Sequence, residues 1–536
     1  MVRHRLVGRL IWIVPAGLFL LHSLLFRSWL IDDAGISFAY ARNLALGYGL
    51  VSQPGRMPVE GYSNFLWTVS LSPFFALDLF SPPLTPKVWS ACLVFLSFLA
   101  LYRLLHSLDR RGPEMAAAVL TFLAVNTPFV VWATSGLENP LYVLLLSLLL
   151  LCTLRATVLE ETTVRAGLLG GLLAGGLGLT RPDGVVFFPA FPVLLLVRAM
   201  RRKAPPSRLW PALGGYLGLF AAIYGGFLVF RWTYYHDLVP NTYYAKGGPT
   251  LQDLLNLLLL RPEALSKILD GLYAVAGPFG GLVLLALVAT TVVLLTRRRF
   301  RREHLVLAVF LLLALADYVL MPSDWHGEFR YATSLVVLVY LYAVTIAVAL
   351  LRGLERPRRV KVRLAGLILA VCWGLSLLQF GGRSLRFAQD PSVPFAEVAR
   401  LAERFDRYAD VLGLENASVL LPDVGGTLYY SRLQVYDLGG LTDRTVALTL
   451  LRRQDLEAFH DYVFDTVRPT FIHTHGLWAY LARLDDDPRF RRDYAAIREG
   501  LDPWIREKFG LEMYSGDYVR REVAGGRLGE LQNTGP

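Results

Sequence analysis

Residues 141–200 read LYVLLLSLLLLCTLRATVLEETTVRAGLLGGLLAGGLGLTRPDGVVFFPAFPVLLLVRAM. Short polar turns divide this stretch into three apolar runs, at 140–158, 164–180 and 184–199. A helix needs roughly 20 mostly apolar residues to cross a bilayer. Runs of this kind recur from residue 9 to about residue 381, so the sequence predicts a polytopic helical membrane protein.

The composition of the whole chain supports this prediction. Of its 536 residues, 54% are hydrophobic and only 18% are charged, whereas soluble proteins carry about 25% charged residues. The net charge of +11 does not indicate a nucleic-acid partner, because the basic residues cluster between apolar runs, as the positive-inside rule expects. The cysteines lie within apolar runs, which favours neither disulfides nor a cysteine-based metal site.

The apolar runs and the basic clusters together predict the topology. The stretch 65–80 is short, contains Asp78 and is followed by prolines. If this stretch does not span the membrane, the basic clusters at 297–302 and 352–363 lie in the cytoplasm, as the positive-inside rule favours. We therefore interpret 65–80 as a re-entrant or interfacial helix. The predicted spans, about eleven, are 9–30, 86–106, 115–134, 140–158, 164–180, 184–199, 209–231, 268–296, 304–321, 331–351 and 364–381.

The composition changes near residue 382. We predict a membrane domain at 1–382, with its first outer loop at 32–85, and a soluble domain at 383–536. The soluble domain alternates helix-like and strand-like segments, which is typical of a small α/β domain. Its helix-like segments are 397–412 and 446–467, and its strand-like segments are 418–422, 433–437 and 470–474.

This topology places the N-terminus in the cytoplasm and the soluble domain outside it. The usage is rich in arginine, leucine and alanine and poor in lysine, which indicates the inner (plasma) membrane of a bacterium. All loops that are polar without being basic fall on the outer side. Polar loops can also simply cap helices, but the presence of all these loops on one side favours a shared functional site. These loops are 31–64, 135–139, 180–184, 232–248 and 323–330.

The first outer loop begins with two adjacent carboxylates, Asp32 and Asp33. Carboxylates at a membrane boundary are costly unless they have partners. A carboxylate there can deprotonate an acceptor hydroxyl, and Asp is also a favoured N-cap, here for a helix over 34–46. Both interpretations stay open, since one Asp can cap while the other catalyses.

Several cations share the predicted outer side. Lys246 stands where charge bias does not place a lysine, and it suits a phosphate as a point charge. Arg330 can bind phosphate in a bidentate manner, and His326 can bond a phosphate or a metal. Arg181, close to Asp183, is equally explained by a salt bridge at the membrane boundary. The sequence has no Walker motif or nucleotide-binding glycine pattern, which argues against a nucleotide substrate at the cytoplasmic face.

Taken in order, these motifs resemble the GT-C glycosyltransferases, and most closely the branch of the mycobacterial terminal arabinofuranosyltransferase. The residues that carry the resemblance are Asp32-Asp33, YARNLALGYGLV (40–51), VEGYSNFLWT (59–68), SGLENPL (135–141), TRPDG (180–184), LVPNTYYAK (238–246), DWHGEFRY (324–331), LPDVGGTLYYS (421–431) and VYDLGGLTD (435–443). One departure is His326, because the branch is expected to have Asp-Trp-Met at 324–326.

The resemblance implies an inverting transfer of a sugar from a polyprenyl phosphate. An acidic residue of the first outer loop is then the general base, which carries over to Asp32 or Asp33, with Asp32 preferred by its place in the motif. Glu138 and Asp324 are candidates to orient these groups or hold a metal. The implied phosphate ligands are Lys246, Arg330, His326 and Arg181. The implied substrate-orienting residues are Glu60, Tyr62, Glu138, Asp237, Asn241 and Asp324.

The implied partners are a polyprenyl-phosphate sugar, a glycan or glycolipid acceptor of the cell envelope, and the bilayer, with no nucleic acid. Arabinofuranose is the first candidate for the sugar, and a divalent cation is the one candidate cofactor. Transfer of a hexose such as mannose to a protein or glycolipid is an alternative. A transporter is another, but it predicts charged residues within spans near mid-membrane.

Overall fold

The structure is a computed structural model that describes residues 13–109, 111–202, 206–322, 326–353 and 357–534. The chain divides into two compact units. The membrane unit comprises 1–28, 81–229 and 249–392, and the outer unit comprises 29–80, 230–248 and 393–536. The first outer loop therefore packs with the C-terminal domain, and the predicted boundary at 382 falls inside the helix Arg358–Gln389.

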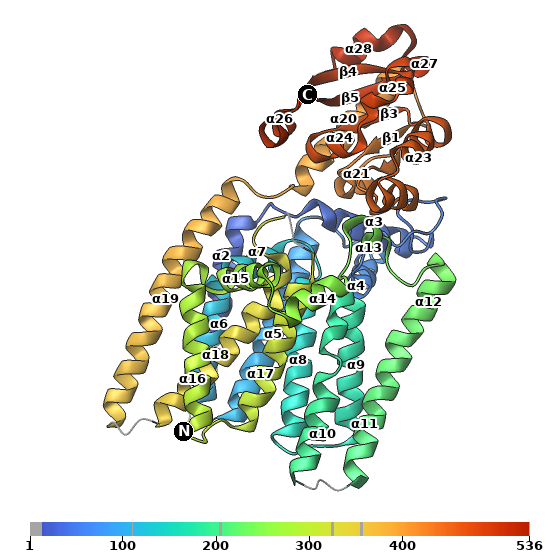
Figure 1. The fold of residues 1–536 in the computed structure, drawn as a ribbon. Helices are drawn as coiled ribbons and strands as arrows, with labels where there is room; N and C mark the ends of the chain where they lie inside the picture. The colour runs from blue at the N-terminus through green and yellow to red at the C-terminus, as the bar shows by residue number, and fades with distance from the viewer. Residues whose placement is uncertain (1–12, 110, 203–205, 323–325, 354–356, 535–536) are drawn as a thin grey trace. The chain divides into compact units, whose positions relative to one another are not determined.

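The membrane unit is a bundle of long helices that run side by side, as the blue to yellow part of Figure 1 shows. Their apolar composition needs no polar face, because lipid or other helices surround them. The helices are α2 (Ile13–Ser23), α5 (Leu84–Leu108), α6 (Gly112–Val125), α7 (Thr127–Thr134), α8 (Asn139–Thr157), α9 (Val164–Thr180), α10 (Ala190–Arg202), α11 (Pro206–Phe220), α12 (Gly226–Tyr235), α14 (Leu251–Leu258), α15 (Pro262–Ala276), α16 (Gly280–Thr296), α17 (Arg302–Leu320), α18 (Thr333–Gly353) and α19 (Arg358–Gln389).

Within the described residues, eight helices are long and apolar enough to cross a membrane, or nine if one bent pair counts as a single span. The chain is thus a multi-pass membrane protein, and the described residues support eight or nine of the roughly eleven predicted spans. Two predicted spans are short: α9 has 17 residues, and the described part of 9–30 forms an apolar helix over Ile13–Phe26.

A further difference from the predicted spans is a break within 115–134. Helices α6 and α7 meet there at an angle of 70°. Asn126 leaves the helical conformation, and its side-chain oxygen accepts the backbone N–H of Phe129 at 2.9 Å. Because Pro128 offers no backbone N–H, a continuous helix would lose a hydrogen bond at this point. Hydropathy alone does not reveal such a break.

The stretch 65–80 does not form a long helix. It contains α4 (Phe65–Ala76), which has 12 residues and belongs to the outer unit. At 1.5 Å per residue, such a helix is about 18 Å long, well short of the roughly 30 Å hydrocarbon core. This length agrees with the prediction that 65–80 does not span.

The outer unit contains a mixed five-stranded sheet in the order β2-β1-β3-β5-β4. Strands β1, β2 and β3 are parallel, and β5 pairs antiparallel with β3 and β4. The strands are β1 (Ser418–Leu421), β2 (Gln434–Asp437), β3 (Phe471–Thr474), β4 (Tyr494–Leu501) and β5 (Tyr514–Arg520). The helices are α3 (Asp32–Ala45), α4, α13 (Asn241–Lys246), α20 (Phe395–Leu412), α21 (Val424–Tyr430), α22 (Arg444–Val446), α23 (Leu456–Asp461), α24 (Gly476–Ala482), α25 (Pro488–Asp493), α26 (Pro503–Phe509), α27 (Arg521–Ala524) and α28 (Leu528–Gln532).

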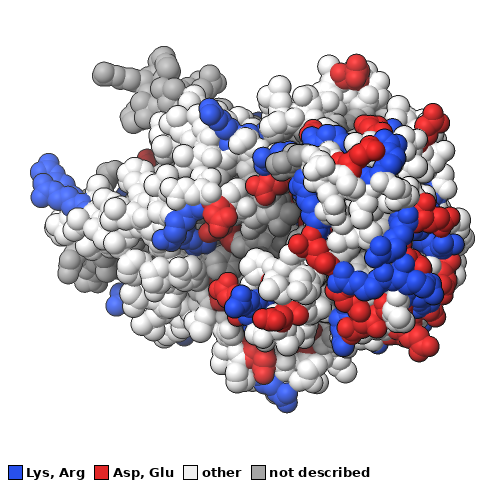
Figure 2. All heavy atoms as spheres, turned by 90° about the horizontal axis from the view of Figure 1, so that it is seen from above, with Lys and Arg blue, Asp and Glu red and all other residues white. Residues whose placement is uncertain are grey.

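The predicted small α/β domain is confirmed as a mixed sheet with helices. The three predicted strands and the helix at 397–412 correspond to β1, β2, β3 and α20. The predicted helix at 446–467 is wrong as one element, because Gln454 has a positive φ of 55° and the next residue, Asp455, caps a new helix. Figure 2 shows charges of both signs interspersed on this domain's surface, which is typical of a surface in water.

Candidate functional site

The carboxylate of Asp32 is bound by the backbone of the C-terminal domain. Asp32 begins α3, and its two oxygens accept the N–H groups of Gly425 at 2.9 Å and Gly426 at 2.7 Å, in the first turn of α21. A Cβ on Gly35 would lie 2.4 Å from the carbonyl carbon of Gly425, so only glycine allows this approach of the two helices. Asp32 is 5% exposed and caps α21, which offers N–H groups that its own turns leave unpaired.

A second carboxylate, Asp423, stands near Asp32 at the end of β1. Burial raises the pKa of Asp32 well above its ordinary value, and the charge of Asp423 raises it further, against the two N–H bonds from α21. His475, directly after β3, donates from Nε2 to Asp423 at 2.6 Å. Burial lowers the pKa of His475, but the bond and charge of Asp423 bring it above the ordinary value. The carboxyl ends of β1 and β3 therefore present charged groups to α3.

Asp33 has a different environment from its neighbour. Its Oδ2 lies 2.9 Å from the Nζ of Lys246, the last residue of α13. The Asp33 side chain is 19% exposed and that of Lys246 is 31% exposed, so solvent reaches this pair, as it also reaches Asp423 and His475, whereas Asp32 is buried. Two loops that are 213 residues apart in sequence thus bring a carboxylate and an ammonium together.

The remaining predicted residues of the outer unit hold its loops in place. Glu60 forms a bidentate ion pair with Arg231, at 2.6 and 3.0 Å, and both side chains are buried. Burial raises the pKa of Glu60, while the Arg231 guanidinium opposes that change. The hydroxyl of Tyr62 is hydrogen-bonded to that of Tyr235 at 2.9 Å, and Tyr62 is buried.

Asp237 and Asn241 tie the predicted outer loop at 232–248 to the C-terminal domain. Asp237 pairs with Arg444 at 2.5 Å and accepts the Tyr244 hydroxyl at 3.0 Å. Burial raises the pKa of Asp237, but these bonds bring it below the ordinary value. The amide of Asn241 donates to the carbonyls of Gly440 at 2.7 Å and Leu441 at 2.9 Å. Both residues therefore anchor α13, and with it Lys246.

In the membrane unit, Glu138 and Arg330 form a buried ion pair at 3.0 Å. The Arg330 guanidinium also lies 5.9 Å from the centre of a Trp132 ring, and His326 meets Trp132 edge to face at 6.2 Å. His326 is buried, and its backbone carbonyl accepts the hydroxyl of Ser392. The turn at 135–138 and the segment at 326–331 are thereby brought together, while Asp324 lies outside the described residues.

Arg181 is enclosed rather than open. It forms a bidentate pair with Asp183, at 3.1 and 2.5 Å, and its side chain is 4% exposed. The rings of Tyr142 and Tyr331 lie 4.7 and 5.0 Å from the guanidinium carbon. This environment is that of the membrane-boundary salt bridge which the sequence left open as the alternative.

The described residues contain no group of three or more His, Cys, Asp or Glu side chains placed to hold a metal ion. Glu138 is committed to Arg330, and Asp324, the other candidate ligand, is not among the described residues. The donor set of the described chain therefore does not fit a divalent cation, and we assign no chemical step to one.

No protein-family model matches the chain, and no curated protein matches it. Solved structures do. The oligosaccharyltransferase AglB of Archaeoglobus fulgidus matches at a TM-score of 0.52 and 11% identity, over 88% of this chain and 69% of its own. ArnT of Cupriavidus metallidurans matches at 0.51 and 15% identity, over 90% of this chain and 93% of its own. The chain shares the fold of these two structures.

The branch within this fold is not shown. The mycobacterial arabinofuranosyltransferase AftD matches at a TM-score of 0.48 and 14% identity, over 95% of this chain and 40% of its own. This similarity is too low to support the arabinofuranosyl branch. The comparisons thus show a shared fold, whereas the branch and the sugar are not shown.

Within this fold, sequence reasoning missed two features. Lys87 lies in the first turn of α5, and its ammonium donates to the Thr134 carbonyl at 2.9 Å without a carboxylate partner among the described residues. A lysine at the start of an apolar run was the available signal. His475 was also missed, because its proximity to Asp423 depends on the pairing of β1 with β3.

Proposed function

We propose that this chain transfers a sugar from a polyprenyl-phosphate carrier to a hydroxyl group of a cell-envelope glycan, on the outer side of the membrane. The GT-C fold supports the class of enzyme, and the AglB structure that it matches is a complex with a dolichol-phosphate. The observation that carries the proposal is the Asp33–Lys246 pair. Its carboxylate and ammonium lie 2.9 Å apart and are partly exposed, which supports the proposal of a base beside a phosphate-binding cation.

We assign the general base to Asp33 and a positioning role to Asp32. The resemblance alone favours Asp32, but that carboxylate is buried and both its oxygens accept backbone N–H groups. A base must come within hydrogen-bond distance of the hydroxyl that it deprotonates. Asp33 is the more exposed of the two, and Asp32 orients it by fixing the start of α3 against α21.

The reaction then proceeds in a single displacement. Asp33 accepts the proton of the acceptor hydroxyl while that oxygen attacks the anomeric carbon of the sugar. The bond between the anomeric carbon and the phosphate oxygen breaks, and the bonding electrons leave with the polyprenyl phosphate. The configuration at the anomeric carbon is inverted. Because a phosphate is a stable anion, the leaving group needs a cation more than it needs a general acid.

For the donor phosphate we propose Lys246, the cation that lies beside Asp33 in the outer unit. Its side chain is partly exposed, and a lysine binds phosphate as a compact point charge. We propose a structural role for Arg181, because Asp183 already occupies its guanidinium. Glu60, Tyr62, Asp237 and Asn241 orient the substrate indirectly, by holding the loops that carry Asp33 and Lys246.

Arabinofuranose is our first candidate for the donor sugar, on the strength of the ordered motifs from residue 32 to residue 443. A hexose such as mannose is the second candidate, because the GT-C fold does not distinguish the two sugars. A transporter is less well supported: Asp317, a buried carboxylate of a span, lies one turn before the end of α17 rather than near its middle.

A donor panel tests the proposed function. The purified chain in nanodiscs is incubated with polyprenyl phosphates carrying arabinofuranose, mannose, glucose or no sugar. We expect release of polyprenyl phosphate from at least one sugar donor, by slow hydrolysis without acceptor and by faster transfer with an envelope glycan. Binding of labelled polyprenyl phosphate to the chain is measured in parallel. No release from any donor together with no binding would contradict the proposal.

Replacing Lys246 by Gln is expected to raise the donor KM by roughly 10–100-fold. The reason is that the phosphate loses one charge-assisted hydrogen bond, which contributes about 1.5–3 kcal/mol. Lys246→Arg keeps the charge and is expected to recover much of the affinity. Lys508→Gln, an exposed lysine of α26 in the same unit, controls for the change in net charge. An unchanged donor KM in Lys246→Gln would remove Lys246 from the phosphate site.

A further inference from the structure

A cavity of about 160 Å³ lies at one end of the helix bundle, within the membrane unit. It is enclosed by the last turn of α5, the first turns of α6 and α17, the loop after α16 and the last turns of α18. The positive-inside rule predicts that this end faces the cytoplasm. The cavity is therefore not part of the proposed glycosyltransferase site, whose loops belong to the opposite, outer side of the predicted topology.

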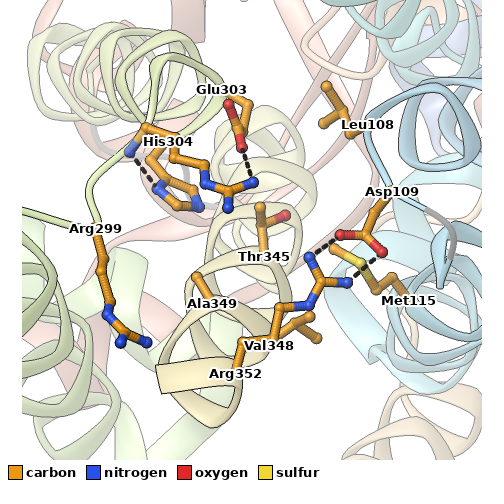
Figure 3. Close-up of a pocket in the computed structure, with 11 residues that line it drawn as sticks. Leu108, Asp109, Met115, Arg299, Glu303, His304, Thr345, Val348, Ala349 and Arg352 are labelled. Atoms are coloured by element: carbon orange, nitrogen blue, oxygen red, sulfur yellow. Dashed lines mark hydrogen bonds and ion pairs between the residues drawn. The ribbon is translucent and has the colours of Figure 1, made fainter. Parts of the chain in front are cut away.

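The cavity is lined both by charged side chains and by small or apolar ones (Figure 3). Arg299, Arg301 and Arg352 line it together with the carboxylates Asp109 and Glu303, which leaves a formal excess of one positive charge. Small and apolar lining side chains come from α6 and α18. These are Met115, Thr345, Val348 and Ala349.

The excess charge is localised at Arg299. Arg352 is engaged by Asp109, and Arg301 has Glu303 within 3.9 Å. Arg299 makes no ion pair with any residue that the structure describes, and Figure 3 shows it apart from the other pairs. The cavity also lies at the N-terminus of α17, a helix of 19 residues, where the helix dipole adds partial positive charge.

A buried imidazole adds a directed donor. His304 lines the cavity and is 2% exposed. Its Nδ1 accepts the backbone N–H of Arg301 at 2.9 Å, so the proton of the neutral ring is on Nε2. No residue among those described accepts a hydrogen bond from Nε2. Because His304 lines the cavity, its ring can donate from Nε2 to an anionic oxygen there.

We propose that this cavity binds the phosphate group of an anionic membrane lipid. A phosphodiester carries one negative charge, which matches the excess of one positive charge, and its oxygens accept from Arg299 and His304. The apolar lining residues suit the adjoining glycerol and acyl region, since the flanking helices α5, α17 and α18 are long and apolar enough to cross a membrane. Basic pockets between helices at the cytoplasmic side are suited to such headgroups. A zwitterionic lipid fits less well, because its amine cancels the charge.

The test measures lipid binding by the full-length chain, purified and delipidated in detergent. Native mass spectrometry and thermal unfolding are recorded with phosphatidylglycerol, phosphatidylcholine and soluble glycerol phosphate. The test variant is Arg299→Gln with Arg301→Gln. The control is Arg297→Gln with Arg298→Gln, which removes the same charge from the same loop but changes no residue that lines the cavity.

We expect wild type and control to retain phosphatidylglycerol in preference to phosphatidylcholine and to melt at a higher temperature with it. The test variant is expected to bind phosphatidylglycerol about tenfold more weakly, since each basic residue near a membrane surface contributes several-fold in affinity. Equal losses in both double variants would show diffuse attraction and overturn the site. So would an unchanged preference in the test variant. If glycerol phosphate raised the melting temperature as much as phosphatidylglycerol does, the bound phosphate would not have to come from a lipid, and the proposal of a lipid site would be overturned.

Discussion

Replacing Asp33 by Asn is expected to lower the rate of sugar transfer by about 10²–10⁴-fold, the usual contribution of a general base. Asn keeps the shape of the side chain but cannot accept the hydroxyl proton. Donor binding is expected to change little, because the substitution removes no cation from the phosphate site. The rate and the donor KM are measured separately in nanodiscs, with the donor that the panel identifies.

Asp32→Asn is the matched control for this prediction. Its amide nitrogen would face one of the two N–H groups of α21, so a loss of stability of about 1–3 kcal/mol is expected. Thermal unfolding therefore distinguishes the two variants: Asp33→Asn keeps the melting temperature of wild type, and Asp32→Asn does not. If Asp33→Asn is fully active while Asp32→Asn is well folded and inactive, the two roles are reversed.

The largest loss of stability is expected from Glu60→Gln, at roughly 3–5 kcal/mol, because removing one partner of a buried ion pair leaves the other charge uncompensated. Arg231 is 4% exposed, and the Leu238 carbonyl that it also contacts is a neutral and weaker acceptor than the Glu60 carboxylate. The pair joins the first outer loop to the end of α12. Its loss is therefore expected to reduce transfer activity as well, through displacement of the loops rather than of the reacting groups.

Asp237→Asn provides the comparison for Glu60→Gln. Its partner Arg444 is 45% exposed in its side chain, and pairs of this kind contribute only about 0–1 kcal/mol because water screens them. Thermal unfolding of both variants in the same detergent measures the difference. Equal small losses for both would mean that the Glu60–Arg231 pair is more hydrated than its burial indicates, and the stability argument would fail.

Hydropathy predicted most of the membrane helices correctly, and for a direct reason. In lipid each span must satisfy its own backbone hydrogen bonds, so the signal is local and about 20 residues long. The prediction failed where a local detail overrides the average. Asn126 and Pro128 break one apolar run, and Gln454 divides a segment of the soluble domain that otherwise looks helical.

The candidate site was predictable as a set of residues but not as a geometry. Asp32, Asp33 and Lys246 stood out because they lie at predicted outer boundaries of the membrane, where a charged side chain is costly unless it is paired or has a function. Which partner each one has could not be predicted. The N–H groups that bind Asp32 come from residues 393 and 394 positions later, and no local pattern in the sequence encodes such a pairing.

The sequence by itself determined that this chain enters a membrane and which segments are apolar, because transfer into lipid depends on the side chains of each segment alone. Which polar loops share a side stays a prediction of the positive-inside rule. Only the tertiary structure decided that Asp32 is buried against α21 while Asp33 meets Lys246. Burial and ion pairing depend on the packing of α3 against the C-terminal domain, and the close approach of Gly35 to Gly425 makes that packing possible.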